Sequence, residues 1–430
     1  MLSPGDLIDL VVERPAARGR MIARHEGQIV LVSGAIPGEK VVARIERVER
    51  RLAFARVHEV LQASPDRREP AGDPLCGGCL YAHIAIERQR AIKAEVIADA
   101  FARIGRHPLG GPVPVAASPE QGYRMRARLH VRGRQVGFHR EGTHDLCDGS
   151  ATGQLRPEAV TAAVRVAAAV DAAGAPAASL AIAEDLAGEQ RAMFVELTAP
   201  GTLSRSALER LVAPDLASIT AVSPNGARLA AGPAIIEDSL AALTAGRATG
   251  RLRRSAESFF QANRFLLPQL VISVIDSVLP EGTVLDLYAG VGLFAASLAG
   301  CGRGSITAVE GAGPSGMDLQ ENARAFPSLV TAVVGPVERF IARAGTLGPT
   351  VIVDPPRTGL SPSVLQALVA RGGARIVYVS CDAPTMARDT RGLIDGGYEL
   401  QSLRAFDLFP NTPHVEAVGV FQRGWELGAR

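Results

Sequence analysis

The sequence predicts a mixed α/β protein whose carboxyl-terminal part is a doubly wound parallel sheet. From about Arg251 the chain repeats a strand, a glycine turn and a helix, which is typical of a parallel sheet covered by helices on both faces. Residues 1–62 contain short strands punctuated by glycine and proline, which favours a small antiparallel β-barrel. Residues 63–245 alternate short strands with alanine-rich helices, so we expect a central α+β domain before a third domain at 246–430.

Composition limits the kind of protein. Of 430 residues, 47% are hydrophobic, 21% are charged and 4% are aromatic, which describes a globular chain of two or three domains. The apolar run from Thr161 to Ala183 is interrupted by Arg165 and Asp171, so we expect no membrane span. The first ten residues lack a basic start and an apolar signal core. We therefore expect a cytoplasmic enzyme, a monomer, with no membrane partner.

Basic residues are concentrated between Ala71 and Arg140, where eleven Lys/Arg stand against five Asp/Glu although the net charge of the whole chain is only +2. Within this region, YRMRARLHVRGR (residues 123–134) alternates basic and apolar residues, which places several arginines on one face of a strand. Such a face can follow a phosphate backbone, and it can equally be a solvated sheet face. Charge alone leaves both interpretations open.

A glycine turn predicts a ligand site. Residues 283–299, TVLDLYAGVGLFAASLA, form a buried strand, a turn with Gly290 and Gly292, and the start of a helix that includes Ala295. The next strand ends at Glu310, where an acid can accept hydrogen bonds from ribose hydroxyls. This pattern fits a nicotinamide cofactor, S-adenosylmethionine or a plain crossover without a ligand, and does not separate them.

Three reactive groups follow later strands. Asp354 comes at the end of a predicted buried strand in VIVDPPRTGL (351–360). Cys381 comes at the end of the next predicted strand in YVSCDAPTMARDT (378–390). Glu416 lies in the later segment DLFPNTPHVEAVGVF (407–421). A structural cysteine would be expected inside the apolar run, because a free thiol behaves as a small hydrophobe. We expect Asp354, Cys381 and Glu416 to reach one edge of the sheet. Together they suit methylation of C5 of uracil, in which a thiolate adds to C6 and a carboxylate later removes the C5 proton.

These segments resemble a known family, the S-adenosylmethionine-dependent RNA uracil-C5 methyltransferases, in the TRAM-domain branch related to the 23S rRNA enzymes. The matching stretches are SFFQAN, DPPRTGL, SCDAPTMARD and FPNTPHVE, which occur in the family's order along nearly the whole chain. The resemblance implies a Rossmann-like catalytic domain and a TRAM/OB-like barrel that binds RNA. It implies formation of 5-methyluridine, with large-subunit ribosomal RNA as the first substrate and transfer RNA as the alternative.

The resemblance also implies residue roles. Cys381 matches the nucleophile and Glu416 the base, while Arg357 matches a loop arginine expected near the target base. Positions that contact S-adenosylmethionine in the family are matched by Gln261, Tyr288, Glu310 and Asp354.

Two positions depart from the family's pattern. Leu293 stands where asparagine is frequent, and Gly335 with Pro336 replaces an acidic or amide residue expected near the adenine. These departures put the cofactor affinity in doubt, although the chemistry uses neither position.

The five cysteines are expected to be free, metal-bound or catalytic in a reducing compartment. Cys76 and Cys79 form a C-x-x-C pair, and the iron–sulfur branch of the family implies that Cys147 would join them in a [4Fe–4S] site. The remaining ligand position holds Pro70, so Asp73 or an external group would have to complete the site. Loss of the cluster is an equally open interpretation.

Two other classes of function compete with RNA methylation. A non-catalytic RNA-binding or RNA-folding protein can share the fold, and the glycine turn alone permits a nicotinamide oxidoreductase or a methyltransferase for a small molecule or protein. The presence of both Cys381 and Glu416 speaks against these alternatives.

Overall fold

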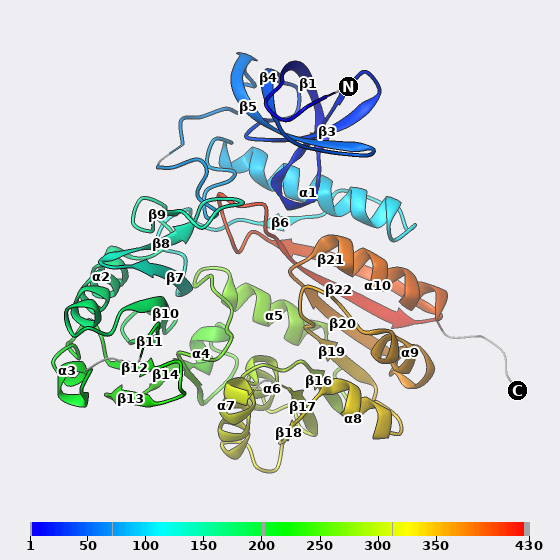
Figure 1. Ribbon diagram of the computed structural model, residues 1–430. Helices are drawn as coiled ribbons and strands as arrows, with labels where there is room; N and C mark the ends of the chain where they lie inside the picture. Colours follow the sequence, from blue (N-terminus) through cyan, green and yellow to red (C-terminus); the bar gives the residue numbers. More distant parts are fainter. Residues whose placement is uncertain (1, 71, 200–202, 312, 425–430) are drawn as a thin grey trace, which may run out of the picture.

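The computed structural model describes residues 2–70, 72–199, 203–311 and 313–424. It has three lobes: an amino-terminal barrel at the top of Figure 1, a central sheet at the lower left and a carboxyl-terminal sheet at the lower right. The predicted fold class is confirmed. Every helix among the described residues is too short or too polar to cross a lipid bilayer.

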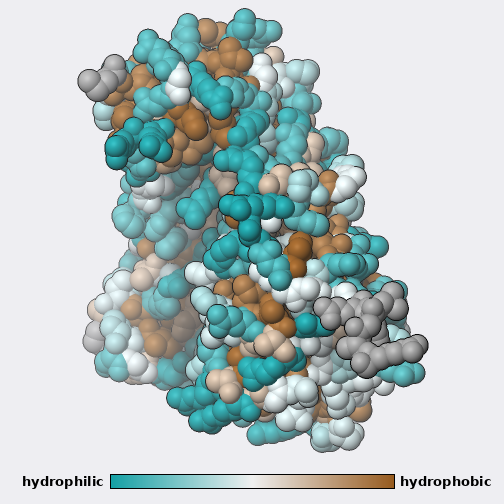
Figure 2. All heavy atoms as spheres, turned by 90° about the vertical axis from the view of Figure 1, so that its right-hand side faces the viewer, coloured by the Kyte–Doolittle hydropathy of each residue, from teal (hydrophilic) through white to brown (hydrophobic). Residues whose placement is uncertain are grey.

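The amino-terminal lobe is a closed barrel in the order β1-β2-β3-β5-β4. Neighbouring strands are antiparallel except for the parallel pair β3 and β5, a detail that the predicted antiparallel barrel lacked. Figure 2 shows apolar side chains on the surface of this lobe, and the exposed apolar residues of its strands are Leu7, Val11, Ile29 and Leu61. The strands are β1 (Leu7–Pro15), β2 (Met21–His25), β3 (Gln28–Ser33), β4 (Lys40–Glu49) and β5 (Leu52–Gln62).

The central lobe is a seven-stranded sheet in the order β13-β12-β11-β10-β7-β8-β9, with α2 packed on one face. The predicted alternation of the basic strand is confirmed, because Ala127 and Leu129 are buried while Arg126 and Arg128 lie on the opposite face of β7. The elements are β7 (Arg126–Arg132), β8 (Gln135–His139), β9 (Leu146–Asp148), α2 (Pro157–Ala172), β10 (Ala177–Glu184), β11 (Arg191–Leu197), α3 (Arg205–Glu209), β12 (Ser218–Val222) and β13 (Arg228–Ala231).

A short ribbon connects the central lobe to the carboxyl-terminal lobe. It pairs β14 (Ile235–Ser239) with β15 (Arg251–Ser255), and α4 (Leu240–Leu243) lies between these strands in the chain.

The carboxyl-terminal lobe is an eight-stranded sheet in the order β18-β17-β16-β19-β20-β22-β21-β6. Strands β16 to β20 run parallel, and separate apolar cores cover the two faces of the sheet, as a doubly wound fold requires. The elements are α5 (Leu267–Ser277), β16 (Val284–Leu287), α6 (Leu293–Gly300), β17 (Ile306–Glu310), α7 (Gly313–Arg324), β18 (Val330–Val334), α8 (Val337–Arg343), β19 (Thr350–Val353), α9 (Pro362–Arg371), β20 (Arg375–Ser380), α10 (Ala383–Asp395), β21 (Tyr398–Phe406) and β22 (Glu416–Arg423).

One segment of the predicted central domain belongs to this third lobe. The helix α1 (Ile86–Arg103) packs on α10, and the short strand β6 (Val115–Ala116) adds to the edge of the eight-stranded sheet beside β21. In Figure 1, α1 lies between the barrel and the carboxyl-terminal sheet. The predicted central domain, residues 63–245, therefore contains segments that pack with two different sheets.

A buried ion pair fixes α1 to the loop that leads into β22. The Lys93 ammonium donates hydrogen bonds to an Asp407 carboxylate oxygen and to the carbonyl of Phe409, the latter at 3.1 Å. Both charged side chains are 1% exposed. Such a pair is destabilising when one partner is removed, because the other charge stays buried and uncompensated.

This geometry predicts the effect of Lys93→Met. We expect the free energy of unfolding to fall by about 3–5 kcal/mol in the single variant, because Asp407 keeps its buried charge. The double variant Lys93→Met with Asp407→Leu should recover most of that loss. Urea unfolding followed by circular dichroism measures both, and an unchanged midpoint in Lys93→Met would contradict the assignment.

Candidate active site

The six residues predicted from the sequence to be catalytic or to bind the cofactor all line one cavity of about 640 Å³. The cavity lies at the carboxyl ends of the parallel strands, the edge at which doubly wound sheets bind ligands. The expectation that Asp354, Cys381 and Glu416 reach one edge of the sheet is therefore confirmed. The predicted residues in the lining are Gln261, Tyr288, Glu310, Asp354, Cys381 and Glu416, and Arg357 lies among them.

Cys381 occupies the turn between a buried strand and a capped helix. Strand β20 ends at Ser380, and the Asp382 side chain caps α10 by accepting the Thr385 amide at 2.9 Å. Burial and, after it, the charge of Glu416 raise the pKa of the Cys381 thiol to about 11. Arg357 opposes both effects through its positive charge. The thiol is therefore protonated at neutral pH and depends on its surroundings for activation.

Glu416 begins β22 and is 3% exposed. Burial raises its pKa well above the ordinary range, Asp354 raises it further and Arg357 lowers it. Its Oε1 accepts no hydrogen bond from any residue that the structure describes. A carboxylate oxygen without a partner, in the same cavity as a thiol, can accept a proton from a bound substrate.

Asp354 follows β19 and is held by the turn that Pro355 and Pro356 make rigid. Its backbone amide donates to the Leu287 carbonyl at 3.3 Å, and its carboxylate accepts a bond from the Gln261 side chain at 3.5 Å. Burial raises the pKa of Asp354 to about 7, Glu310 adds to this effect and Gln261 opposes it.

The glycine turn opens the backbone toward the cavity. Gly290 has φ of 58°, and a Cβ added there would meet nothing within 4 Å, so its surface is available to a ligand. The Gly290 amide donates to a Glu310 carboxylate oxygen at 2.8 Å. Tyr288 enters the same turn with φ of 60°, and burial raises the pKa of its hydroxyl, as does Glu338.

Sequence reasoning missed two acids in this cavity region. Asp286 is fully buried in β16, and burial raises its pKa to about 8, with Asp354 adding to the shift. A carboxylate within the apolar strand VLDL is the signal that could have identified it. The family's pattern predicts an acidic or amide residue where this chain has Gly335 and Pro336. Glu338 is two positions after Pro336 and lines the same cavity. The departure at Gly335 and Pro336 therefore does not leave that wall without an acid.

The residues present fit S-adenosylmethionine. Several carboxylates surround the cavity, and raised pKa values show that burial opposes their ionisation until a cation lies nearby. The cofactor carries a positive sulfonium and an ammonium group. Glu310 lies where a ribose-binding acid is expected, and Gly290 permits close approach of a ligand.

The cysteine segment forms a separate structure. Cys76 and Cys147 are joined in a disulfide with Cα atoms 5.6 Å apart, and Cys79 is buried beside them. This corrects the expectation that Cys76 and Cys147 are free, metal-bound or catalytic, whereas Cys79 is a free thiol. Strand pairing explains it, because Cys76 bridges to Arg140 while Cys147 pairs with Phe138 on the same sheet.

The metal prediction for Cys76, Cys79 and Cys147 receives no support. Pro70 supplies no ligand atom, and the Asp73 carboxylate is held by Arg140 at 2.6 Å and the Leu75 amide at 2.9 Å. Within the described ranges no group of three or more His, Cys, Asp or Glu side chains is arranged to hold a metal ion. The residues present therefore do not fit a four-thiolate cluster.

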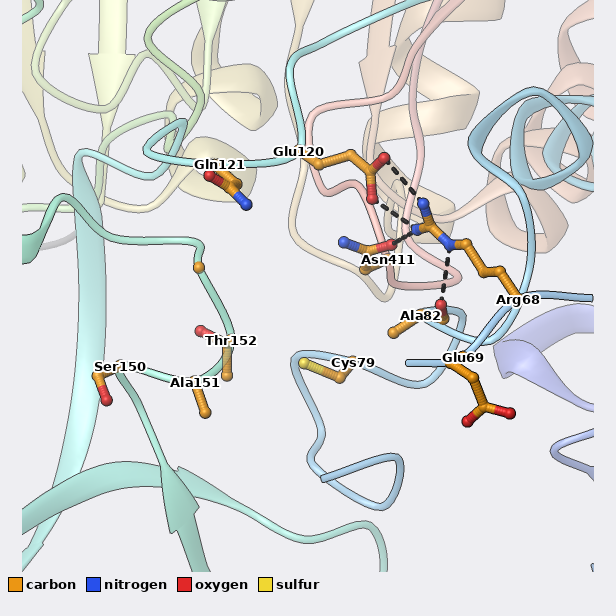
Figure 3. Close-up of a pocket in the computed structure, with 11 residues that line it drawn as sticks. Arg68, Glu69, Cys79, Ala82, Glu120, Gln121, Ser150, Ala151, Thr152 and Asn411 are labelled. Atoms are coloured by element: carbon orange, nitrogen blue, oxygen red, sulfur yellow. Dashed lines mark hydrogen bonds and ion pairs between the residues drawn. The ribbon is translucent and has the colours of Figure 1, made fainter. Parts of the chain in front are cut away.

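The Cys79 thiol lines a cavity of about 430 Å³ instead. Figure 3 shows Arg68 in contact with Glu120 and Asn411 on the wall of this cavity, with Cys79 elsewhere in the lining. Burial raises the pKa of Cys79 to about 11 and Asp73 adds to the shift, so the thiol is protonated.

Comparisons with known proteins agree with this site. The tRNA (Uracil-5-)-methyltransferase family model matches residues 346–423, and the TRAM domain model matches residues 3–58. The 23S rRNA (uracil(1939)-C(5))-methyltransferase RlmD of Pseudomonas entomophila is 33% identical over 96% of this chain and 93% of its own. The enzyme of the same name from Methylococcus capsulatus is 32% identical over 98% of both chains.

A solved structure shares the fold across the full length. The Pyrococcus abyssi tRNA (uracil-54, C5)-methyltransferase, in complex with S-adenosyl-L-homocysteine, superposes with a TM-score of 0.74 at 24% identity, covering 96% of this chain and 99% of that chain. With whole-length relatives above 30% identity and both family models matched, the resemblance inferred from the motifs is confirmed. The chain belongs to the S-adenosylmethionine-dependent RNA uracil-C5 methyltransferases that carry a TRAM domain.

Proposed function

We propose that this enzyme methylates C5 of a uridine in 23S ribosomal RNA through a covalent bond between Cys381 and C6 of the base. The observation that carries the proposal is the presence of the Cys381 thiol and the unpaired Glu416 carboxylate in one cavity, next to the residues that fit the cofactor. Neither group has an evident structural task. Both groups are required for the addition and elimination steps at a pyrimidine ring.

The chain's own residues divide the reaction into two easier steps. Cys381 releases its proton to solvent while the adjacent Arg357 stabilises the thiolate, and its sulfur bonds to C6 as the C5–C6 π electrons shift to C5 and O4 of the ring. S-adenosylmethionine supplies the methyl group as an electrophile. Glu416 then takes the C5 proton, and the electron pair restores the C5–C6 double bond as the bond from C6 to sulfur breaks. The raised pKa of Glu416 makes it a stronger proton acceptor once it is ionised.

The whole-length relatives favour large-subunit ribosomal RNA as the substrate. Those named for 23S rRNA match the barrel, the central sheet and the catalytic sheet together. Transfer RNA is the alternative, because the Pyrococcus abyssi protein of similar fold is a tRNA enzyme. In either RNA, an unpaired uridine in a loop is favoured, since taking a base from its stack costs a few kcal/mol.

Covalent catalysis predicts opposite behaviour for two variants. RNA containing 5-fluorouridine should form a stable adduct with the parent enzyme, because fluorine cannot leave as the C5 proton does. Cys381→Ala should form none. Glu416→Gln should accumulate a methylated adduct on ordinary RNA, because the C5 proton stays in place. Denaturing gel electrophoresis and mass spectrometry of the peptide containing residue 381 detect each species.

Cys301→Ala is the matched control for the thiol, because Cys301 is partly exposed and lies outside the cavity. It should behave as the parent enzyme does. Rapid turnover by Glu416→Gln would remove that residue from its role. Unchanged RNA binding by Cys381→Ala, together with no methylation by the parent enzyme, would favour the non-catalytic RNA-binding alternative.

The choice of RNA predicts a specific loss in cells. Nucleoside mass spectrometry of 23S rRNA from cells lacking the gene should show one 5-methyluridine fewer than the parent strain, and its tRNA should be unchanged. As the control, the parent gene should restore the missing 5-methyluridine, and the gene for Cys381→Ala should not. Loss of 5-methyluridine from tRNA alone would transfer the proposal to tRNA.

The raised pKa of Asp354 predicts pH-dependent cofactor binding. Asp354 is protonated below about pH 7 in the ligand-free enzyme, so attraction of a cation is present above that pH and is lost as the pH falls through it. Affinity for S-adenosylmethionine should rise about tenfold from pH 6 to pH 8, following the ionised fraction. Isothermal titration calorimetry in buffers of different ionisation enthalpy measures the affinity and the released proton.

S-adenosylhomocysteine, which lacks the sulfonium charge, is the ligand control and should show a weaker pH dependence. Asp354→Asn should lower the affinity for S-adenosylmethionine and flatten its profile. A profile that stays steep in Asp354→Asn would assign the proton to another group.

A further inference from the structure

A second cavity adjoins the active site. It measures about 380 Å³ and shares part of its lining with the first cavity. The shared residues are Phe259, Phe260, Gln261, Arg357 and Phe409. The remaining wall includes Arg124 and Arg126 at the start of β7, the Gly77–Gly78 pair, and Thr412 and His414 from the loop before β22. A molecule that occupied both cavities would therefore cross from the cofactor edge of the sheet to the basic strand β7.

This second cavity concentrates cations that lack acidic partners. Arg124, Arg126 and Arg357 all line it, and none of them forms an ion pair with a carboxylate in the described part of the chain. Arg124 donates to the Gln154 side chain at 2.7 Å and Arg126 to the Ser258 carbonyl at 3.0 Å, both neutral acceptors.

Nearby arginines behave differently. Arg128, two residues further along β7, is paired with Glu196, and Arg254 is paired with Asp238 at 2.9 Å. Burial and, after it, the neighbouring positive charges of Arg254, Arg124 and Arg128 lower the pKa of Arg126 to about 10. A half-buried guanidinium that the protein leaves uncompensated is stabilised when an anion binds.

An exposed aromatic ring lies directly beside this charge. Phe259 is 61% exposed, an unusual state for a phenylalanine, and it lines both cavities. The Arg126 guanidinium lies over its ring, 5.5 Å from the centroid. A flat apolar face next to an unpaired guanidinium presents the two groups that a single nucleotide requires, a stacking surface for its base and a cation for its phosphate.

We propose that the second cavity binds the nucleotide adjacent to the target uridine, with its phosphate on Arg126 and its base stacked on Phe259. The inference rests on the proposed function, because it takes the uridine itself to occupy the first cavity. Arg357, which lines both cavities and lowers the pKa of the Cys381 thiol, then lies between the bound phosphate and the reacting base. Holding the adjacent phosphate fixes the backbone while the uridine leaves its stack, which confines the base to the thiol.

Equilibrium binding of a hairpin RNA tests the site without requiring catalysis. The probe is a fluorescein-labelled hairpin whose loop contains one uridine flanked by adenosines, added to enzyme saturated with S-adenosylhomocysteine so that no methyl transfer occurs. Arg126→Gln should weaken binding about tenfold, as expected for a lost charge-assisted contact. It should also lower the slope of log affinity against log salt concentration by about 0.7, the value for one single-strand phosphate contact.

Phe259→Leu should weaken binding about tenfold with an unchanged salt slope, since stacking involves no counterion release. Arg126→Lys keeps the charge and should keep the slope. The matched control is Arg128→Gln on the same strand, whose charge Glu196 already offsets, and it should leave both quantities as in the parent. S-adenosylhomocysteine affinity, measured for every variant, verifies that each remains folded.

A neutral methylphosphonate at each loop linkage locates the contact. One linkage beside the uridine should weaken binding to the parent enzyme and have no further effect on Arg126→Gln. An affinity and salt slope in Arg126→Gln equal to those of the parent, or an equal loss in Arg128→Gln, would overturn the site. Methylation by the parent enzyme with an unaltered slope in Arg126→Gln sinks this inference alone. A reduced salt slope in Arg126→Gln, together with no methylation by the parent enzyme, would support the RNA contact. The same pair of results would contradict the proposed function.

Discussion

The structure depends on the burial of several carboxylates at one end of a parallel sheet. Asp286 on β16, Glu310 on β17 and Asp354 after β19 approach one another because parallel strands deliver their carboxyl ends to the same edge. Glu416 reaches that edge because β22 runs antiparallel to β20 and begins there. Burial and mutual repulsion raise the pKa values of Asp286, Asp354 and Glu416, which makes their ionised forms costly in the ligand-free enzyme. A cationic cofactor offsets that cost. The same strand arrangement that brings the carboxylates together therefore favours a positively charged ligand.

The two adjoining cavities differ in the ionisable groups that line them. The first contains the carboxylates, and the second contains arginines without carboxylate partners in the described chain. Arg357 lines both and lowers the pKa values of Cys381 and Glu416. A uridine at this boundary would have its cationic methyl donor on one side and its anionic backbone on the other. Such a charge separation would orient the proposed substrate before any specific contact with its base is made.

The positions of the residues in the first cavity could be predicted from the sequence, because they depend on short-range sequence patterns. Asp354 and Cys381 each follow a β-branched run directly, so strand direction alone places them at the ligand edge. Other features depend on pairing between distant segments. The strand β6 has only two residues and so shows no periodicity in the sequence. The disulfide between Cys76 and Cys147 depends on the register of β8 and β9. The order of the central sheet was likewise beyond sequence reasoning, because β10 pairs with β7 across β8, β9 and α2, and β11 pairs in parallel with β12 across α3.

The glycines between Cys76 and Cys79 are explained by packing rather than by metal chemistry. A Cβ on Gly78 would lie 2.2 Å from the Gln154 side-chain nitrogen, and one on Gly77 would lie 3.0 Å from the His139 carbonyl, to which the Gly77 amide is bonded. Both glycines line the second cavity, and Gln154 also bonds Arg124 there. A larger residue at Gly78 would displace Gln154 and so release Arg124. The segment that resembles a cluster site therefore positions part of the basic wall, and it needs only close backbone approach to do so.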